Sequence, residues 1–402
     1  MRAEDAAPTG ALGAALRRFL ALESASTIVL LVLTGAALAL ANSPLHDAYE
    51  RALHLPLALG VGSFRVAMTL HHFVNDALMA LFFFLVGMEI KRELVLGELA
   101  TPSRAALPAF GALGGMVVPA AIYAALHAGG PAIRGWGIPM ATDIAFAVAA
   151  LAVFGSRVPS GLKIFLLALA IVDDIGAVLV IAFFYSSHLA PPWIAAAVAG
   201  LLLCALLGRA SVASYGVYVL IGAFVWYATW RSGVHATIAG VALGLLTPAR
   251  PLAGRDRSPI DEVEHRLHGW VAFAVIPIFA LCNAGVAIDA TSLGDPLAQR
   301  VAVGVGLGLV VGKPIGVTLA AWLAVRLGVA ALPGGVDWRQ ITGTGLLAGI
   351  GFTVALFIGA LAFPDESLVA GAKIGTLVAS ALATALGAAW LAASLPIRSD
   401  ET

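Results

Sequence analysis

IFLLALAIVDDIGAVLVI, residues 164–181, is an apolar run whose only charged residues are two adjacent aspartates, Asp173 and Asp174. Such a run is long enough to cross most of a bilayer as a helix. One ionisable residue at the centre of a membrane helix costs about 3 kcal/mol, so a consecutive pair persists only where it faces protein, water or an ion. The two aspartates are therefore the first candidates for a functional site.

The composition of the whole chain indicates an integral membrane protein. Of its 402 residues, 60% are hydrophobic and 11% are charged, whereas about 25% of the residues of soluble domains are charged. The formal net charge is zero and no long run of one sign occurs, so we expect the lipid bilayer and not nucleic acid as a partner. We interpret Cys204 and Cys282, which lie inside apolar runs, as small core residues rather than a disulfide.

Twelve apolar segments predict an all-α polytopic membrane protein with twelve transmembrane helices. The eighth segment is shorter than the roughly 20 residues of a full crossing, so it is either extended by its flanks or ends inside the protein. One transporter domain is expected at 27–395, and the segments are 27–42, 75–88, 105–126, 136–154, 162–185, 193–207, 213–229, 235–246, 271–288, 301–327, 341–363 and 370–395.

The basic residues orient these spans. An even number of spans puts both termini on one side, and sixteen of the 23 lysines and arginines fall on that side. By the positive-inside rule both termini are cytoplasmic. Residues 1–26 are then a cytoplasmic segment in which 11–22 forms a short interfacial helix, and 396–402 form a cytoplasmic tail. The alternative for 27–41, behind Arg17 and Arg18, is a signal peptide.

Between the first two spans, residues 55–68 alternate apolar and small side chains around Gly60-Val61-Gly62. This pattern favours a β-hairpin on the outer side, whose edge could join two protomers. An irregular loop is the alternative.

Few charges lie inside the predicted spans. We expect Asp143 in the fourth, Asp173 and Asp174 in the fifth and Lys313 in the tenth to share one polar pocket. Left ionised and unpaired, these groups would cost on the order of 10 kcal/mol. Asp76 and Glu89 lie near the two ends of the second span.

Two spans carry residues that interrupt helices. Pro139 and Thr142 precede Asp143 in the fourth span, and Gly349 and Gly351 lie at the centre of the eleventh. Paired interruptions are typical of transporter binding sites. Spans 3–5 and 10–12 follow the same order, and their odd offset of seven predicts an inverted-topology repeat with two broken, crossing helices. The alternative is that the glycines only permit close helix packing.

If the two breaks cross, like ends of short helices meet at mid-membrane. Asp143 would then compensate the positive N-terminal ends, and Lys313 would compensate the negative C-terminal ends.

Six strings in this order resemble the NhaA family of bacterial sodium/proton antiporters, for which an inverted-repeat architecture is already known. They are GMEIKREL at 87–94, ATDIAF at 141–146, IVDDIGA at 171–177, SGVHAT at 232–237, GKPIG at 312–316 and GIGFT at 349–353. The resemblance implies an electrogenic antiporter of the inner membrane that extrudes sodium or lithium in exchange for protons by alternating access. It also implies activity at alkaline pH, a role in sodium and pH homeostasis, a homodimer and no cofactor.

The resemblance gives the candidate residues unequal roles. Asp174 is the principal cation ligand, and Asp173 is a second essential carboxylate that binds sodium or pairs with Lys313. Thr142 and Asp143 belong to the broken fourth span, with Thr142 as a further cation ligand. The alternative for Lys313 is a purely structural role.

The resemblance also links a cytoplasmic cluster to the pH response. Its members are Glu89, Arg92, Glu93, Glu264, His265 and His268, and His235 at the start of the eighth span is a further candidate regulator. Histidines titrate near neutrality, which suits sensing. The alternatives are a solvated helix end for the cluster and a plain interfacial histidine for His235.

These residue types suit sodium/proton exchange. Sodium is a hard cation that prefers carboxylate, hydroxyl and carbonyl oxygens. A carboxylate that binds either a proton or sodium, but not both, couples the two fluxes. Adjacent residues of a helix point about 100° apart, so Asp173 can face Lys313 while Asp174 faces the cation path.

Three rival functions remain at this stage. An intramembrane aspartyl protease needs two aspartates on separate helices, and no Gly-x-Gly-Asp string precedes Asp173. A sodium-coupled symporter would need donors for an organic anion. A channel would need a filter-like string, which the chain lacks.

Overall fold

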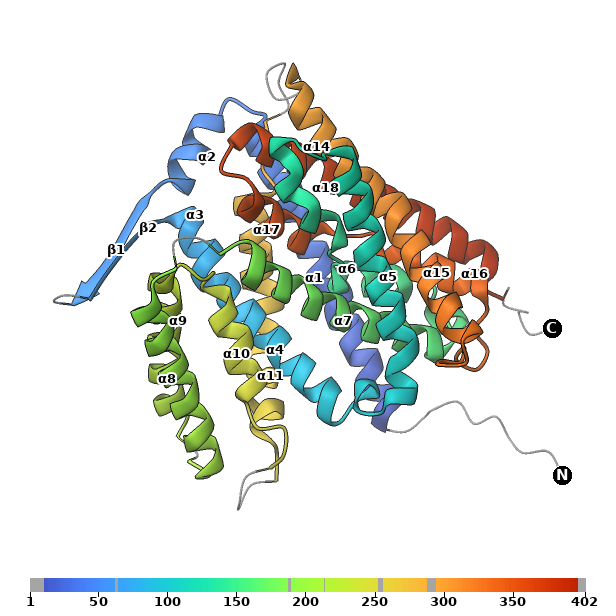
Figure 1. Ribbon diagram of the computed structural model, residues 1–402, viewed down its shortest axis with the longest axis horizontal. Helices are drawn as coiled ribbons and strands as arrows, with labels where there is room; N and C mark the ends of the chain where they lie inside the picture. The colour runs from blue at the N-terminus through green and yellow to red at the C-terminus, as the bar shows by residue number, and fades with distance from the viewer. Residues whose placement is uncertain are drawn as a thin grey trace.

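A computed structural model describes residues 11–61, 64–186, 189–212, 214–251, 256–287 and 294–396. The described chain is a helical bundle with one small sheet that projects from its side (Figure 1). The first half contains α1 (Ala11–Ala41), α2 (His46–Leu53), β1 (Pro56–Val61), β2 (Phe64–Thr69), α3 (Leu70–Phe73), the π-helical turn η1 (Val74–Leu78), α4 (Met79–Val95), the 3-10 turn η2 (Glu98–Ala100), α5 (Pro102–Leu126), the 3-10 helix η3 (Pro131–Met140), α6 (Ile144–Ala152), the 3-10 turn η4 (Gly155–Arg157) and α7 (Ser160–Phe184).

The second half is also helical. It contains α8 (Pro191–Arg209), α9 (Tyr215–Ser232), α10 (Thr237–Leu246), α11 (Pro259–Trp270), the π-helical turn η5 (Val271–Val275), α12 (Ile276–Asn283), α14 (Pro296–Leu307), the π-helical turn η6 (Gly308–Gly312), α15 (Lys313–Arg326), α16 (Trp338–Ala348), α17 (Phe352–Ala362) and α18 (Glu366–Ser394).

Seven helices of the described residues are long and apolar enough to cross a membrane, and up to ten crossings result if each bent pair of helices is one span. Large apolar side chains are exposed on the outer surface, among them Phe183 at 77% and Leu220 at 74%. Side chains of this kind suit a surface that faces lipid rather than water. The protein is therefore a multi-pass membrane protein.

The eighth apolar segment is not extended by its flanks, because the helix that it forms, α10, has only ten residues. It packs against α4 through glycines: a Cβ on Gly240 would lie 2.1 Å from the Ala80 carbonyl oxygen. The predicted boundary near residue 26 is not a helix boundary, since α1 continues from Ala11 to Ala41 without interruption. A separate helix at 11–22 is therefore not seen.

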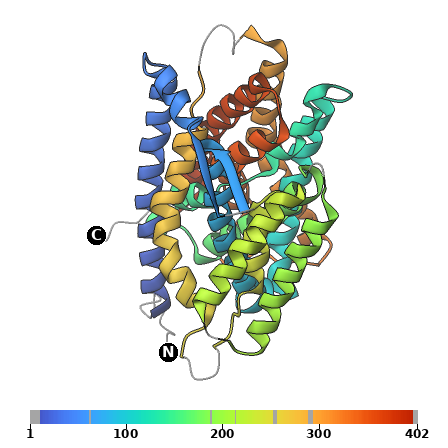
Figure 2. The ribbon, with the colours of Figure 1, turned by 90° about the vertical axis from the view of Figure 1, so that its left-hand side faces the viewer.

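The segment predicted as a hairpin or an irregular loop forms the antiparallel pair β1–β2, with Pro56 opposite Thr69 and Leu59 opposite Val66. Alternating apolar and small side chains suit such a pair. Figure 2 shows the two strands on the side of the bundle that faces the viewer, and in Figure 1 the same strands project away from the helices.

Two pairs of helices are interrupted near the middle of the bundle. η3 and α6 are bent by 40° at residues 141–143, and α16 and α17 are bent by 47° at residues 349–351. Pro139 lies in the last turn of η3. Glycine and proline interrupt helices at the predicted positions, and these interruptions place backbone polar groups inside the protein.

Helix α15 lies directly against α5. A Cβ on Gly114 would lie 2.1 Å from the Gly316 carbonyl oxygen, so only glycine permits this approach of two backbones. The π-helical turn η6 immediately precedes Lys313. Turns of this kind occur often at functional sites, and here one fixes the direction in which a lysine enters the core.

Candidate cation site

The two interrupted helices touch at their breaks. The Asp143 backbone N–H donates to the Ile350 carbonyl at 2.6 Å, and the Thr142 hydroxyl lies 2.8 Å from the Ala348 carbonyl. The Asp143 carboxylate accepts from the N–H of Phe146 at 3.2 Å and from the N–H of Thr353 at 3.0 Å. Because these N–H groups lie in the first turns of α6 and α17, a single carboxylate caps two helices.

Lys313 lies on the other side of the fourth-span break. Its ammonium donates to the carbonyl of Met140, the last residue of η3, and lies 2.8 Å from the Asp173 carboxylate. Both side chains have no exposed surface. Lys313 therefore neutralises Asp173 and stabilises the negative end of η3.

Asp173 has one further contact. Its Oδ2 atom lies 2.8 Å from the lysine and 2.7 Å from the Thr142 hydroxyl, whereas its buried Oδ1 atom has no hydrogen-bond partner in the described part of the chain. A buried carboxylate oxygen without a donor is costly. That oxygen is available to a proton or a cation.

Asp174 faces a different space from its neighbour. It lines a cavity of about 230 Å³, together with Thr142, Asp143 and Thr353 from the two breaks. Asp174 is 5% exposed, and within the described residues no side-chain or backbone donor is bonded to its carboxylate. The sequence predicted that the two adjacent aspartates face different surroundings. In the structure, Asp174 lies beside the two helix breaks, whose side chains carry hydroxyl and carboxylate oxygens.

Four of the six members of the predicted cytoplasmic cluster line the same cavity. They are Glu89, Arg92, Glu93 and His268. Arg92 forms a two-bonded ion pair with Glu264, at 2.6 and 2.7 Å, and Glu93 accepts from the Glu98 N–H at 3.0 Å. A charged cluster and the aspartate therefore border one continuous cavity.

Two predicted pH-response residues lie elsewhere. His265 is exposed and does not line the cavity. His235 lies between α9 and α10, where its Nε2 atom is 3.7 Å from Asp76 and its ring meets the Phe357 ring edge-on at 5.4 Å. The structure thus gives His235 a carboxylate partner that the sequence did not indicate.

Sequence reasoning gave no role to two residues that support the eleventh-span break, one within it and one on α18. The Thr353 hydroxyl donates to Asp143 at 2.5 Å, and the Ser380 hydroxyl accepts from the Phe352 N–H at 3.2 Å. Thr353 follows Gly351 by two residues, which is a typical place for a side chain that serves a helix start. Ser380 gives no local signal, because its partner is 28 residues away in the chain.

Comparisons with known proteins identify the family of the chain. The family model described as Na+/H+ antiporter 1 matches residues 17–391. The chain is 50% identical over 382 residues to a Na(+)/H(+) antiporter NhaA of Acidovorax sp. JS42, covering 94% of this chain and 91% of that one. It is 45% identical over 391 residues to the NhaA antiporter of Shewanella loihica, covering 96% and 99% of the two chains.

A third relative, Na(+)/H(+) antiporter NhaA 2 of Pseudomonas syringae pv. syringae, is 50% identical over 374 residues, covering 92% of this chain and 93% of that one. Similarity over nearly the whole length favours a transporter over the protease, symporter and channel alternatives. The chain belongs to the Na+/H+ antiporter 1 family and is a sodium/proton antiporter.

Proposed function

We propose that Asp174 is the carboxylate for which sodium and protons compete. The observation that carries this proposal is its position: Asp174 lines the cavity beside Thr142 and Asp143, and no residue of the described chain forms an ion pair with it. Carboxylate and hydroxyl oxygens suit sodium, and lithium equally. Loading one species at Asp174 would expel the other and so couple the two fluxes.

Asp173 and Lys313 form the second part of the proposed mechanism. Sodium entering beside Asp174 would also attract the unbonded Oδ1 atom of Asp173. That attraction would weaken the 2.8 Å pair with Lys313, and a lysine released from its partner in an apolar core tends to lose its proton. Two proton-releasing groups for one sodium would make the exchange electrogenic.

Alternating access would expose this site to the two sides of the membrane in turn, driven by the proton gradient as in a secondary active transporter. The contacts at α5–α15 and α4–α10 leave no space even for a Cβ at Gly114 and Gly240. We expect each pair to move as one body, with rocking between the two pairs around the site.

We assign the pH response to the cluster residues that line the cavity, with activation at alkaline pH. Arg92, Glu93 and His268 line the route to Asp174, so a change in their charge would alter cation entry. His235 and Asp76 would act separately, at 3.7 Å from each other. His265 has no cavity contact, and we give it the smallest part.

For the membrane arrangement we propose twelve spans in a bacterial inner membrane, with spans 3–5 and 10–12 as an inverted repeat and both termini in the cytoplasm. α9 and α10 are the two helices added to the ten crossings counted by length and composition. The charge bias of the loops supports this orientation. A homodimer would form through the β1–β2 pair, because exposed strand edges favour pairing.

Everted vesicles test the central proposal. Sodium-induced proton release is measured across pH for the wild type and for Asp174→Asn, with Asp173→Asn and Lys313→Ala in parallel. We expect Asp174→Asn to lose exchange at every pH, and Asp173→Asn to lose most of it. Asp365→Asn, which removes a carboxylate from a helix cap far from the site, is the matched control. Unchanged release in Asp174→Asn would disprove the proposal.

A further inference from the structure

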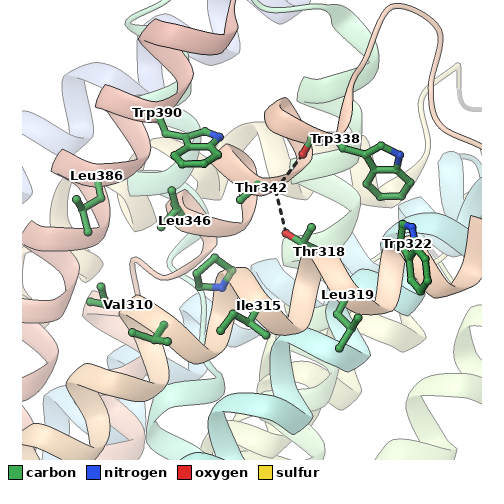
Figure 3. A pocket seen from close by; sticks show the side chains of 12 residues that line it. Val310, Ile315, Thr318, Leu319, Trp322, Trp338, Thr342, Leu346, Leu386 and Trp390 are labelled. Atoms are coloured by element: carbon green, nitrogen blue, oxygen red, sulfur yellow. Dashed lines mark hydrogen bonds between the residues drawn. The ribbon is translucent and has the colours of Figure 1, made fainter.

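A second cavity lies on the surface of the bundle, away from the cation site. The groove between α15, α16 and α18 has a volume of about 700 Å³ and is lined by apolar side chains that include Val310, Ile315, Leu319, Leu346 and Leu386 (Figure 3). Cavities of 300–1,000 Å³ are the usual size for a bound small molecule. The groove is therefore large enough for one lipid acyl chain.

The two threonine hydroxyls and one of the three indole N–H groups in the groove wall are already satisfied within the protein. The Thr342 hydroxyl donates to the Trp338 carbonyl at 2.9 Å, and the Thr318 hydroxyl donates to Thr342 at 3.4 Å (Figure 3). The Trp390 indole donates to the Arg339 carbonyl at 2.8 Å. A polar solute would find few partners along the wall, which excludes a sugar or an amino acid and favours a hydrocarbon chain.

Three tryptophans mark one end of this groove. Trp338 is the first residue of α16, and Trp322 and Trp390 each lie four residues before the end of their helix. Tryptophan is enriched where a membrane helix meets the headgroup region. Within the described residues, the indole N–H groups of Trp322 and Trp338 donate to no protein acceptor, so they are free to bond a lipid ester or phosphate.

Two arginines lie near these tryptophans in the sequence. Arg326 is one helical turn beyond Trp322, and Arg339 follows Trp338; both are exposed, and neither pairs with a carboxylate of the described chain. Exposed arginines with no acidic partner favour a phosphate group. The groove therefore offers an apolar wall for an acyl chain, tryptophans for the ester region and positive charge for the phosphate, in the same order as these groups follow in a phospholipid.

We propose that this groove binds one anionic phospholipid, with an acyl chain between α15 and α16 and its phosphate between Arg326 and Arg339. In the orientation proposed above, the lipid belongs to the cytoplasmic leaflet. Binding itself does not depend on that orientation.

The position of the groove connects such a lipid to transport. Pro314, which lines the groove, is the neighbour of Lys313, and α16 leads from the groove wall to the break at Gly349. A bound chain would hold α15 against α16 while these helices reposition the lysine and the break. We expect anionic phospholipid to raise the exchange rate without changing the residues that bind sodium.

Fluorescence quenching tests the binding directly. The full-length protein, purified in detergent without added lipid, is titrated with phosphatidylglycerol that carries brominated acyl chains, and in parallel with the matching phosphatidylcholine. We expect saturable tryptophan quenching near one phosphatidylglycerol per chain, with an affinity at least about tenfold above that for phosphatidylcholine, since basic residues near the membrane surface attract anionic lipid.

Variants separate the groove from the rest of the surface. Arg326→Gln/Arg339→Gln should bring the phosphatidylglycerol affinity down to that for phosphatidylcholine, whereas Arg104→Gln/Arg257→Gln, which removes two exposed arginines elsewhere, should not. Replacing Trp322, Trp338 and Trp390 by phenylalanine should remove the saturable quenching.

Three results would overturn the proposal: equal affinity for the two lipids, quenching that rises without saturation, or full quenching in the phenylalanine variant. Because none of these measurements uses transport, their failure would leave the antiport mechanism unaffected.

Discussion

The two faces of α7 each carry an aspartate, but the surroundings of the two aspartates differ. On one face, Asp173 lies in a closed pocket with Lys313, and neither side chain has exposed surface. On the other face, Asp174 borders a cavity that continues to Arg92 and Glu93. One residue of the helix, or about 100° of rotation, thus separates a neutralised carboxylate from one that can meet an ion, and the difference arises from what the neighbouring helices contribute.

The two carboxylates therefore differ in their main role: Asp173 supports the fold, whereas Asp174 does not. The closed pocket holds together helices that are interrupted, because Lys313 contacts both Asp173 and the end of η3. Asp174 in the open cavity does not hold helices together, since its carboxylate accepts no hydrogen bond from the described residues. Stability should therefore respond to changes in the closed pocket and little to changes in the open cavity, whereas exchange should respond to changes in both.

The largest effect on stability is expected for Lys313→Ala. Removing the lysine leaves Asp173 as a buried charge without a counter-ion, which costs about 3–5 kcal/mol of the free energy of unfolding. Thermal or denaturant unfolding of the protein in detergent measures this change in the free energy of unfolding. Asp174→Ala is the matched control, and we expect it to change stability by less than about 1 kcal/mol. Equal losses in the two variants would contradict the division between the faces.

Asp143→Ala should have the next largest effect. Its carboxylate caps α6 and α17 together, and each lost cap costs about 0.5–2 kcal/mol, so we expect a loss of about 2–3 kcal/mol. Asp365→Ala removes one exposed cap from α18 and should cost about half as much. A loss no greater than that of the control would show that Asp143 does not hold the two helices.

Thr142→Val tests the boundary between the two faces. Valine keeps the shape but removes the hydroxyl that lies 2.7 Å from Asp173, and hydrogen bonds to charged groups contribute about 1.5–3 kcal/mol. We expect a loss of about 1.5 kcal/mol and a weaker apparent sodium affinity in vesicles. Thr344→Val, which loses a bond inside its own helix, is the control for stability and should keep the sodium affinity. Normal affinity in Thr142→Val would exclude the hydroxyl from the cation site.

The sequence predicted the pocket of Asp173 and Lys313 because the energetic cost of a charged residue in an apolar run can be recognised from the sequence alone. Charged residues in apolar runs require partners, so Asp173 and Lys313 were found from their place in such runs, and proline and glycine marked the two breaks. The pairing of His235 with Asp76 and that of Phe352 with Ser380 depend on how distant helices pack, which no local pattern records. The continuous helix from Ala11 to Ala41 was missed for a related reason: arginines on a helix mark where water begins, and they do not mark where the helix ends.

The smallest effect on stability is expected for Arg92→Gln in the cluster that lines the cavity. Its ion pair with Glu264 is short, but the arginine side chain is 38% exposed, and exposed pairs contribute about 0–1 kcal/mol. We expect stability to change by less than about 1 kcal/mol, while the pH at which vesicles reach half-maximal exchange shifts. Arg104→Gln, whose pair with Glu98 spans 3.8 Å with the arginine 67% exposed, should alter neither quantity. If the Arg92→Gln profile coincides with the wild type, the cluster is a solvated helix end, and the cavity then carries cations to Asp174 without sensing pH.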